Sequence, residues 1–142
     1  MKTIQRSALL PYSAQRVYEL VNDVASYPEF LPWCGGAQVV SMQSAQMVAS
    51  VTIAKAGIKQ TFTTQNTLYE GERIEMSLLD GPFQSLTGQW VFKPLAEDAC
   101  KITFEVSFEM KAGLLSKVLG PIFEQIATTM VDSFCKRAKQ VL

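Results

Sequence analysis

Between Ala37 and Met110 the chain alternates apolar and polar residues with a period of two. In the clearest run, residues 101–110, every second residue is apolar, from Ile102 to Met110. This alternation is typical of antiparallel strands with one buried and one solvated face. Turn-like sequences divide the region at Ser44-Ala45, Ala56-Gly57, Glu70-Gly71, Asp80-Gly81-Pro82 and Glu97-Asp98. The pattern therefore predicts six consecutive strands joined by hairpins.

The first part of the chain predicts one further strand and a short helix. Residues 2–10 have an extended pattern, and Ser13 is a typical N-cap for the helix that follows. Val17, Leu20, Val21 and Val24 recur at helical spacing in this segment. We expect the helix to end near Ala25, before the prolines at 28 and 32, and Gly35-Gly36 to close the loop.

The last part of the chain predicts a long helix. After Gly113, apolar residues recur in steps of three and four, at Leu115, Leu119, Ile122, Ile126, Met130 and Phe134. At about 1.5 Å per residue, roughly 25 residues reach almost 40 Å, enough to cross a whole sheet. Gly120-Pro121 predicts a kink or a loosely ordered beginning of this helix.

Together these elements predict an α+β fold. No linker or repeat divides the sequence, so we expect one domain over residues 1–142. About seven strands would form a curved antiparallel sheet, and the long C-terminal helix would cover its apolar face. Because a bent sheet and a straight helix do not close perfectly, the pattern also predicts an apolar cavity between them.

Charge and composition narrow the possible functions. The chain has 13 Lys and Arg against 13 Asp and Glu, so a general affinity for polyanions such as DNA is not expected. It contains no histidine, which excludes His-based triads and His-metal sites, and we expect no metal and no cofactor. Three separate cysteines and no signal-like or membrane-spanning apolar run predict a cytoplasmic protein, with peripheral contact at the inner face of the membrane left open.

Several motifs resemble a known family. They are Tyr27-Pro28-Glu29-Phe30-Leu31-Pro32-Trp33-Cys34, Gly81-Pro82-Phe83 with Leu86, Gly88 and Trp90-Val91-Phe92, and Phe134-Cys135-Lys136-Arg137-Ala138. The order of elements resembles the helix-grip fold of START and polyketide-cyclase-like domains. The motifs are similar to those of the family that mitochondrial coenzyme Q-binding proteins share with bacterial RatA proteins, and the resemblance covers essentially the whole chain.

The resemblance implies two functions. One is binding of ubiquinone or a similar polyprenyl lipid in the cavity, in support of respiration. The other is association with the large ribosomal subunit, so that 70S ribosomes fail to form, as the toxin of a toxin–antitoxin pair. Of the two functions that the resemblance implies, we expect the non-catalytic lipid-binding function, with ribosome association as the alternative. The two functions would use different surfaces.

The apolar faces of the predicted elements give the candidate ligand site. Its expected lining consists of Trp33, then Ile74, Met76, Leu78, Leu86, Trp90, Phe92, Phe104, Val106 and Phe108 from the strands, and Leu119, Ile122, Phe123, Ile126 and Met130 from the long helix. Such a site suits an isoprenoid chain and a small ring. Each of these residues could equally belong to an ordinary core. A polar strand could add a few hydrogen bonds inside the cavity, but its facing cannot be assigned from the pattern, in which Gln60, Thr64 and Asn66 alternate with Thr61, Thr63 and Gln65.

Two segments leave alternatives open. The loop from Tyr27 to Cys34 is either a lid over the cavity or a rigid plug, and Trp33 could stack on a ligand ring. The segment from Gly113 to Phe123 is more apolar than one buried face requires. It would either contact a bilayer or a partner through Leu114, Val118 or Phe123, with Lys117 at the level of the headgroups, or lie in the cavity mouth.

Basic residues near the C-terminus are the candidates for ribosomal RNA. Residues 111–142 hold five basic and two acidic side chains, and Lys136, Arg137 and Lys139 form a cluster. These cations could contact phosphates, but cations near a helix C-terminus are also favoured by the helix dipole alone. No set of residues supplies a nucleophile with a base and an orienting group, so catalysis is not expected.

Overall fold

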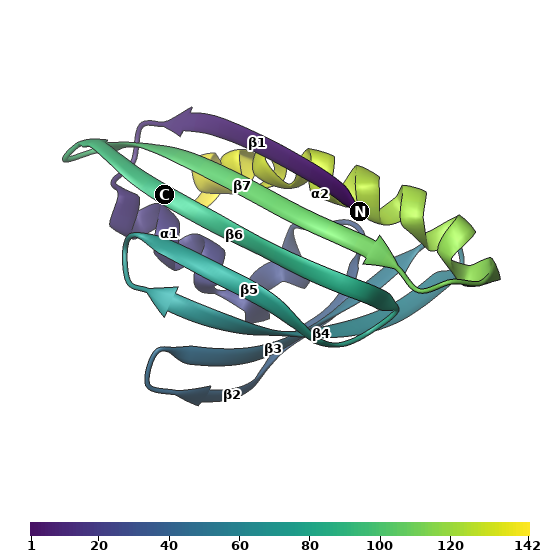
Figure 1. The fold of residues 1–142 in the computed structure, drawn as a ribbon. Coiled ribbons are helices and arrows are strands. Elements are labelled where there is room, and N and C mark those ends of the chain that lie inside the picture. The colour runs from purple at the N-terminus through teal and green to yellow at the C-terminus, as the bar shows by residue number, and fades with distance from the viewer.

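The computed structural model describes residues 1–142 and contains a curved sheet wrapped around one long helix (Figure 1). The chain order is β1 (Lys2–Leu10), α1 (Ala14–Asn22), the 3-10 helix η1 (Val24–Glu29), β2 (Cys34–Gln43), β3 (Gln46–Lys55), β4 (Ile58–Tyr69), β5 (Arg73–Asp80), β6 (Phe83–Ala96), β7 (Ala99–Met110) and α2 (Leu114–Val141). The α+β architecture expected from the pattern and the helix-grip fold implied by the resemblance are both confirmed.

All seven strands form one antiparallel sheet in the order β1-β7-β6-β5-β4-β3-β2. Each hairpin of the meander pairs neighbours in sequence, and β1 returns to pair with the last strand, β7. The five predicted turns all fall between strands. Ser44 and Ala56 adopt a positive φ of 53° there, as tight hairpin turns require.

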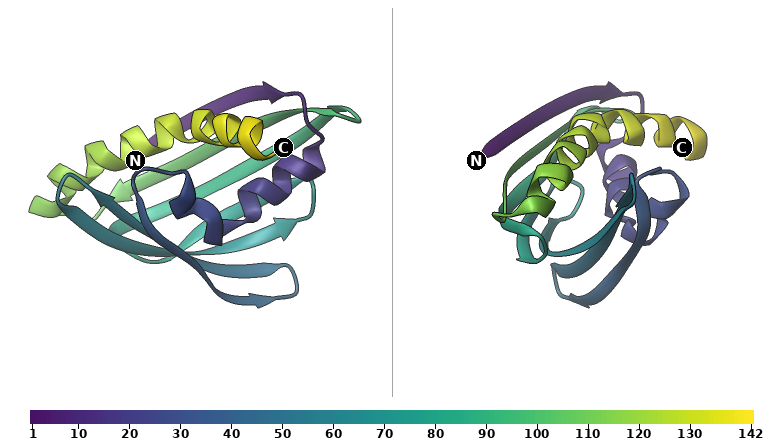
Figure 2. Two further views of the ribbon diagram at one scale, coloured as in Figure 1. Left: turned by 180° about the vertical axis from the view of Figure 1, so that it is seen from behind. Right: turned by 90° about the vertical axis from the view of Figure 1, so that its right-hand side faces the viewer.

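The helices lie on the concave side of the sheet. Figure 2 shows α2 running along the inside of the curve, with α1 near the C-terminal end of α2 and η1 beside β2. The core between them is almost entirely apolar and includes Ile4, Val17, Leu31, Phe92 and Ile102 among its buried residues. The register places Trp90 of β6 opposite Phe104 of β7, so large side chains from neighbouring strands face α2 together.

The short helix begins as the sequence predicts. The Ser13 hydroxyl accepts a hydrogen bond of 3.2 Å from the backbone N–H of Arg16, which caps α1. The segment after it differs from the expected loop, because residues 24–29 form the 3-10 helix η1 with Pro28 inside it. Strand β2 then begins at Cys34, so Gly35-Gly36 lie within the strand and not in a closing loop. The Cβ of an alanine at position 35 would lie 2.8 Å from the Cβ of Ala54, which explains why glycine fits there.

Helix α2 is continuous from Leu114 to Val141. The loosely ordered beginning expected at Gly120-Pro121 is therefore not found. Pro121 lies in the second turn after the start of α2 and lacks the N–H that would bond to the carbonyl of Lys117. The helix tolerates this loss near its end, where the preceding residues Leu114 and Val118 are exposed. No helix of the structure is both long enough and apolar enough to cross a bilayer.

Candidate functional site

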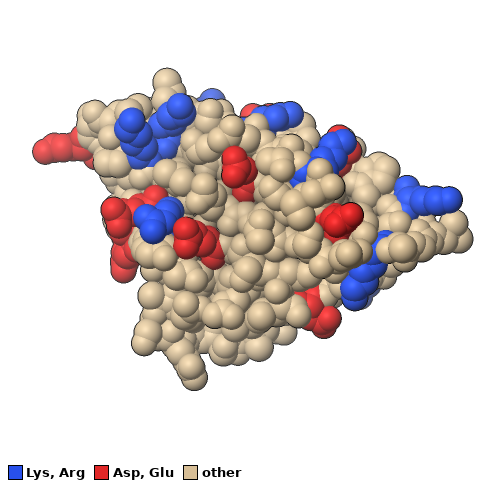
Figure 3. All heavy atoms as spheres, in the orientation of Figure 1, with Lys and Arg blue, Asp and Glu red and all other residues tan.

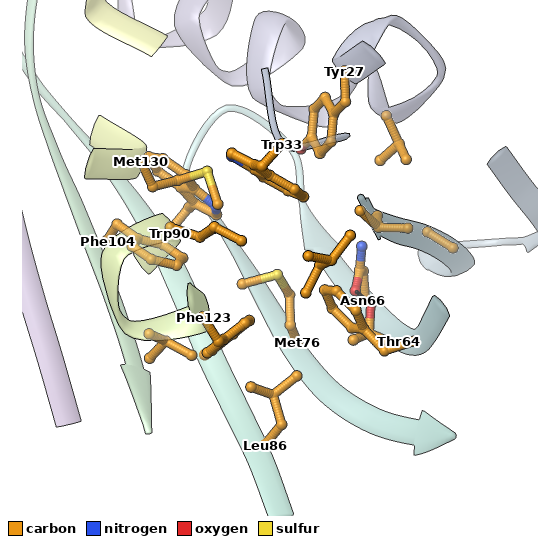
Figure 4. Close-up of a pocket in the computed structure, with 18 of the residues that line it drawn as sticks. Tyr27, Trp33, Thr64, Asn66, Met76, Leu86, Trp90, Phe104, Phe123 and Met130 are labelled. Atoms are coloured by element: carbon orange, nitrogen blue, oxygen red, sulfur yellow. Dashed lines mark hydrogen bonds between the residues drawn. The ribbon is translucent and has the colours of Figure 1, made fainter. Parts of the chain in front are cut away.

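An apolar cavity lies between the concave face of the sheet, α2 and η1 (Figure 4). Its volume is about 90 Å³. The lining consists of Val24, Tyr27, Trp33, Ala49, Val51, Ile53, Phe62, Thr64, Asn66, Met76, Leu86, Gly88, Trp90, Phe104, Val106, Phe123, Ile126, Met130 and Phe134. These residues come from η1, the segment before β2, strands β3 to β7 and α2, so nearly every element contributes to the walls.

Two groups of aromatic rings support the walls of this cavity. In one group Phe123 of α2 packs against Phe108 and Phe83, with ring centres 4.7 and 4.8 Å apart. In the other group Phe134 packs against Tyr27 and Trp90, at 5.5 and 5.2 Å. The contacts are edge-to-face, which is a favourable arrangement for aromatic pairs. Both groups include a ring of α2 that lines the cavity.

Most of the lining expected from the sequence is brought together here. The expected residues that line the cavity are Trp33, Met76, Leu86, Trp90, Phe104, Val106, Phe123, Ile126 and Met130. The others do not line it: Ile74, Leu78, Phe92, Phe108, Leu119 and Ile122 pack in the surrounding core or against it.

These core residues lie on the same apolar faces as the lining residues but do not border the cavity. Phe108 lies behind Phe123, and Phe92 lies beside Trp90 with its other side against Tyr18. A period-two pattern identifies the inward face of a strand, but it does not tell which inward residues border a cavity.

Several lining residues were missed by the sequence analysis. Ala49, Val51 and Ile53 of β3 alternate with Val48, Ser50 and Thr52, so a period-two signal for their inward face was present in the sequence. Phe62 lies in β4, where polar residues occupy both faces and this signal is weak. Phe134 was recognised only as part of the helical repeat. Tyr27 was recognised only as part of the loop, although it lies at the top of the cavity in Figure 4.

Polar chemistry in the cavity is sparse. Thr64 and Asn66 are the two buried polar residues of the whole chain, and the Thr64 hydroxyl donates a hydrogen bond of 2.8 Å to the Asn66 Oδ1. Tyr27 is the one ionisable residue in the lining. Its hydroxyl donates to the carbonyl of Val21, and burial, with Asp23 and Cys34 nearby, raises the pKa of Tyr27 far above its usual range. Its phenol is therefore neutral at physiological pH.

Trp33 separates the cavity from the surface. Trp33 and Ile126 line the cavity on one side, and on the other they line a surface groove of about 330 Å³ that also includes Pro32, Lys55, Gln125, Thr129 and Ser133. The Trp33 carbonyl accepts a hydrogen bond of 2.8 Å from the Ala54 N–H, which fixes its backbone to β3. Movement of the Trp33 and Ile126 side chains would join the two spaces.

The cysteines lie outside the cavity lining. Burial raises the pKa of the Cys34 thiol above its usual value, and the thiol donates to the Gly36 carbonyl at 3.3 Å. Burial also raises the pKa of the Cys100 and Cys135 thiols. All three favour the protonated form, which is a poor nucleophile. No group of three or more His, Cys, Asp or Glu side chains is arranged to hold a metal ion.

The basic residues expected to contact RNA divide into two kinds. Lys136 and Lys139 are exposed on the last turns of α2. Arg137 instead turns toward η1, where its Nη2 lies 3.2 Å from the Glu29 Oε1 and its guanidinium lies 5.0 Å from the centre of the Phe30 ring. Arg137 is thus engaged within the protein.

The beginning of α2 presents apolar and basic side chains to solvent. Leu114, Leu115 and Val118 are exposed, with Leu114 at 80%, and the exposed Lys111 and Lys117 lie beside them in sequence. Phe123 is buried and lines the cavity, so it does not take part in this surface.

Comparison with known proteins agrees with this architecture. Residues 10–135 match the family model described as polyketide cyclase / dehydrase and lipid transport. Among solved structures, an aromatase/cyclase, Zhui from Streptomyces, superposes with a TM-score of 0.85 at 15% identity, over 98% of this chain and 94% of that one. A START superfamily protein from Mycobacterium smegmatis superposes with a TM-score of 0.78 at 19% identity, over 99% of both chains. At these identities the likeness concerns the fold alone.

Two curated relatives are similar in sequence as well. The ribosome association toxin RatA of Pseudomonas aeruginosa is 54% identical over 97% of this chain and 96% of its own length. The mitochondrial coenzyme Q-binding protein COQ10 of Drosophila melanogaster is 30% identical over 95% of this chain, which corresponds to 57% of that protein. The chain therefore belongs to the polyketide cyclase / dehydrase and lipid transport family, and within its START-like members to the group that includes RatA and coenzyme Q-binding proteins.

Proposed function

We propose that this protein associates with the large ribosomal subunit and limits the formation of 70S ribosomes. The observation that carries this proposal is the 54% identity with a protein named ribosome association toxin, over almost the full length of both chains. Because the match extends over the whole fold, it includes surface elements as well as the core. This similarity is stronger than the one to COQ10. We therefore put ribosome association first and lipid binding second, which reverses the order of our initial expectation.

The distribution of charged side chains narrows the choice of surface that could contact the ribosomal subunit. On the outer face of the sheet, basic and acidic side chains are interspersed, and no large area of one sign is visible (Figure 3). The C-terminal turns of α2 carry Lys136 and Lys139, both exposed, with Arg137 held inward by Glu29. We therefore assign the candidate phosphate contact to Lys136 and Lys139 and remove Arg137 from it.

Sucrose-gradient sedimentation tests the ribosome proposal. Adding the purified protein to separated subunits should reduce the 70S peak and move the protein into the large-subunit fractions. Lys136→Glu with Lys139→Glu should weaken this binding and flatten its dependence on salt, since fewer phosphate charges are neutralised. Lys93→Glu with Lys101→Glu makes the same charge change on β6 and β7 and serves as the control. An unaltered 70S peak with the wild-type protein at the top of the gradient would refute the proposal.

A second function is favoured by the cavity itself. We propose that it binds an apolar small molecule of the polyprenyl quinone class without catalysing a reaction. The apolar walls and the single pair of polar residues support a binding site, and Tyr27, the one ionisable group in the lining, is neutral and already hydrogen-bonded. The 30% identity to a coenzyme Q-binding protein supports the choice of ligand class.

The volume of the cavity sets a requirement for this function. Ligand pockets are usually about 300–1,000 Å³, and the cavity measures about 90 Å³. A quinone with a prenyl tail therefore needs the walls to move apart. Met76 and Met130 lie in the lining and have flexible, unbranched side chains, and Trp33 with Ile126 separates the cavity from the larger outer groove.

Intrinsic fluorescence offers a direct test of the ligand. The chain has two tryptophans, and both Trp33 and Trp90 line the cavity. Ubiquinone with two isoprene units should quench their emission and saturate at one molecule per chain. Quenching that does not saturate, or that is equal for free tryptophan at the same quinone concentration, would show that the cavity takes up no quinone.

A further inference from the structure

The Thr64–Asn66 pair is out of place in an apolar cavity. Both side chains project from the inward face of β4 and are only 7% and 6% exposed. Their cross-strand neighbours on that face are Ala49 and Met47 of β3 and Leu78 and Met76 of β5, none of which offers a polar side chain. Burying an amide among such neighbours costs free energy unless its hydrogen-bonding groups are satisfied.

The protein satisfies this pair only in part. The Asn66 Oδ1 accepts the Thr64 hydroxyl at 2.8 Å, and this is the only hydrogen bond that the Asn66 side chain makes within the protein. The two N–H groups of its Nδ2 are left without a protein acceptor. Figure 4 shows this nitrogen directed into the cavity, away from Thr64. Since the Thr64 hydroxyl already donates to the oxygen, the groups of the side chain left without a partner are the two N–H donors, which it offers to the cavity.

We propose that Asn66 is the residue that recognises the polar head of the ligand, and that this head is a hydrogen-bond acceptor without an essential donor, such as a ring carbonyl of an oxidised quinone. Thr64 is a positioning residue, because its hydroxyl holds the Asn66 amide with the nitrogen toward the cavity. The inference rests on the proposed ligand-binding function and adds the chemistry of the head group and its location at β4.

This arrangement also implies a direction of binding. Asn66 lies on β4, whereas the possible opening lies between Trp33 and Ile126. A head group held by Asn66 is surrounded by Met76, Ala49 and Thr64, and an attached apolar tail extends along the aromatic walls. Buried polar groups matched to a ligand acceptor discriminate strongly against ligands that lack it, because the donors are then left unpaired.

Substitutions of nearly constant volume test this assignment. Asn66→Leu should weaken the binding of ubiquinone with two isoprene units about tenfold, equivalent to about 1.4 kcal/mol. Farnesene is a hydrocarbon without hydrogen-bond acceptors, and its binding is measured by the shift in tryptophan emission. Asn66→Leu should leave the affinity for farnesene within about twofold of wild type. Gln65→Leu removes an amide from the opposite face of β4, outside the cavity lining, and is the matched control that should change neither value much.

The double variant Thr64→Val with Asn66→Leu separates recognition from folding. It removes both polar groups together, so no buried donor or acceptor is left unpaired, and its unfolding midpoint should be no lower than that of wild type. It should nevertheless lose the preference for quinone over farnesene. Infrared spectra provide a second measure, because hydrogen bonding to Asn66 lowers the carbonyl stretching frequency of the bound quinone, and the shift should disappear in the Asn66→Leu variant.

The possible outcomes are distinct. If wild type and the Asn66 variants bind quinone equally and show the same carbonyl frequency, head-group recognition by Asn66 is overturned, while ligand binding by the cavity stands. If wild type takes up neither probe, the ligand-binding function and the inference both fail. A loss of quinone binding in Asn66→Leu with retained farnesene binding supports the inference.

Discussion

The guanidinium of Arg137 lies 5.0 Å from the centre of the Phe30 ring and 3.2 Å from the Glu29 carboxylate. This contact joins the C-terminal turns of α2 to the segment between η1 and β2. Phe30 in turn packs on Phe134, with ring centres 5.2 Å apart. The segment that leads into Trp33 is thereby held to the same helix whose residues line the cavity.

Arg137→Gln should therefore destabilise the fold, although Arg137 lies in a basic cluster. Loss of the partly desolvated contact with Phe30 and of the ion pair with Glu29 should cost about 1 kcal/mol in the free energy of unfolding. The neighbouring Lys136→Gln removes the same charge from an exposed position and should cost less than about 0.5 kcal/mol. Urea unfolding followed by circular dichroism measures both, and equal midpoints for the two variants would contradict the assigned role.

Ile126→Ala should speed the exchange of a bound ligand. Ile126 shares the wall between the cavity and the outer groove with Trp33, so a smaller side chain there opens a path to the surface. We expect release of ubiquinone with two isoprene units into empty vesicles to become about tenfold faster, measured by recovery of tryptophan fluorescence.

Val106→Ala is the control for this prediction. Val106 lines the cavity but not the groove, so a shorter side chain enlarges the cavity without opening it. Both substitutions are expected to cost stability through loss of buried methyl groups, and circular dichroism must show that both variants remain folded. Release that is accelerated equally in the two variants would argue against an opening at Ile126.

The exposed beginning of α2 should bind membranes that carry negative charge. Leu114 and Val118 present apolar side chains to solvent, and Lys111 and Lys117 can lie at the level of anionic headgroups. The wild-type protein should float with vesicles of phosphatidylglycerol and phosphatidylethanolamine, and Leu114→Ser with Val118→Ser should abolish flotation.

Leu9→Ser with Leu95→Ser provides the matched control for membrane contact. Both leucines are exposed, but they lie on β1 and β6, away from the beginning of α2. This variant should float like wild type. Flotation that is lost equally in both variants, or that never occurs with the wild-type protein, would remove the beginning of α2 as a membrane contact.

Stability should fall when the pH rises above about 10, the usual pKa of tyrosine. Burial raises the pKa of Tyr27 in the folded state, so above that pH the unfolded chain has lost a proton that the folded chain keeps. Each such proton lowers the free energy of unfolding by about 1.4 kcal/mol per pH unit. Tyr27→Phe should reduce this slope, while costing about 1 kcal/mol at neutral pH for the hydrogen bond to Val21. A slope unchanged in the variant would contradict the neutral, buried state of Tyr27.

Much of the fold could be predicted from the sequence, since hydrophobic period directly reflects which face is buried. The alternation from Ile102 to Met110 and the helical repeat after Gly113 correspond to β7 and α2. The 3-10 helix η1 was not predictable in this way. Pro28 disfavours a regular helix, yet the short turn around it is stabilised by contacts of Tyr27 with Val21 and Phe134. These contacts do not follow helical or strand spacing, so a local sequence pattern does not reveal them.

The candidate site could be predicted only in outline. Trp90, Phe104 and Met130 lie on faces that the pattern marks as inward, so their place in the cavity walls was expected. The facing of Asn66 was not assigned, because both faces of β4 carry polar residues and few apolar ones. Its inward facing comes from the register with β3 and β5, a tertiary property. Arg137 likewise belongs to a basic cluster in sequence but faces Glu29 in space.

The most direct measurement of the cavity's function is to identify what it carries. The protein would be purified without denaturant from a host that makes ubiquinone, extracted with organic solvent and analysed by mass spectrometry, with the Thr64→Val, Asn66→Leu double variant treated in parallel. The account predicts a polyprenyl quinone near one molecule per wild-type chain and much less in the variant. Equal amounts in both would contradict recognition by Asn66, and an empty wild-type extract that added quinone cannot fill would contradict ligand binding by the cavity.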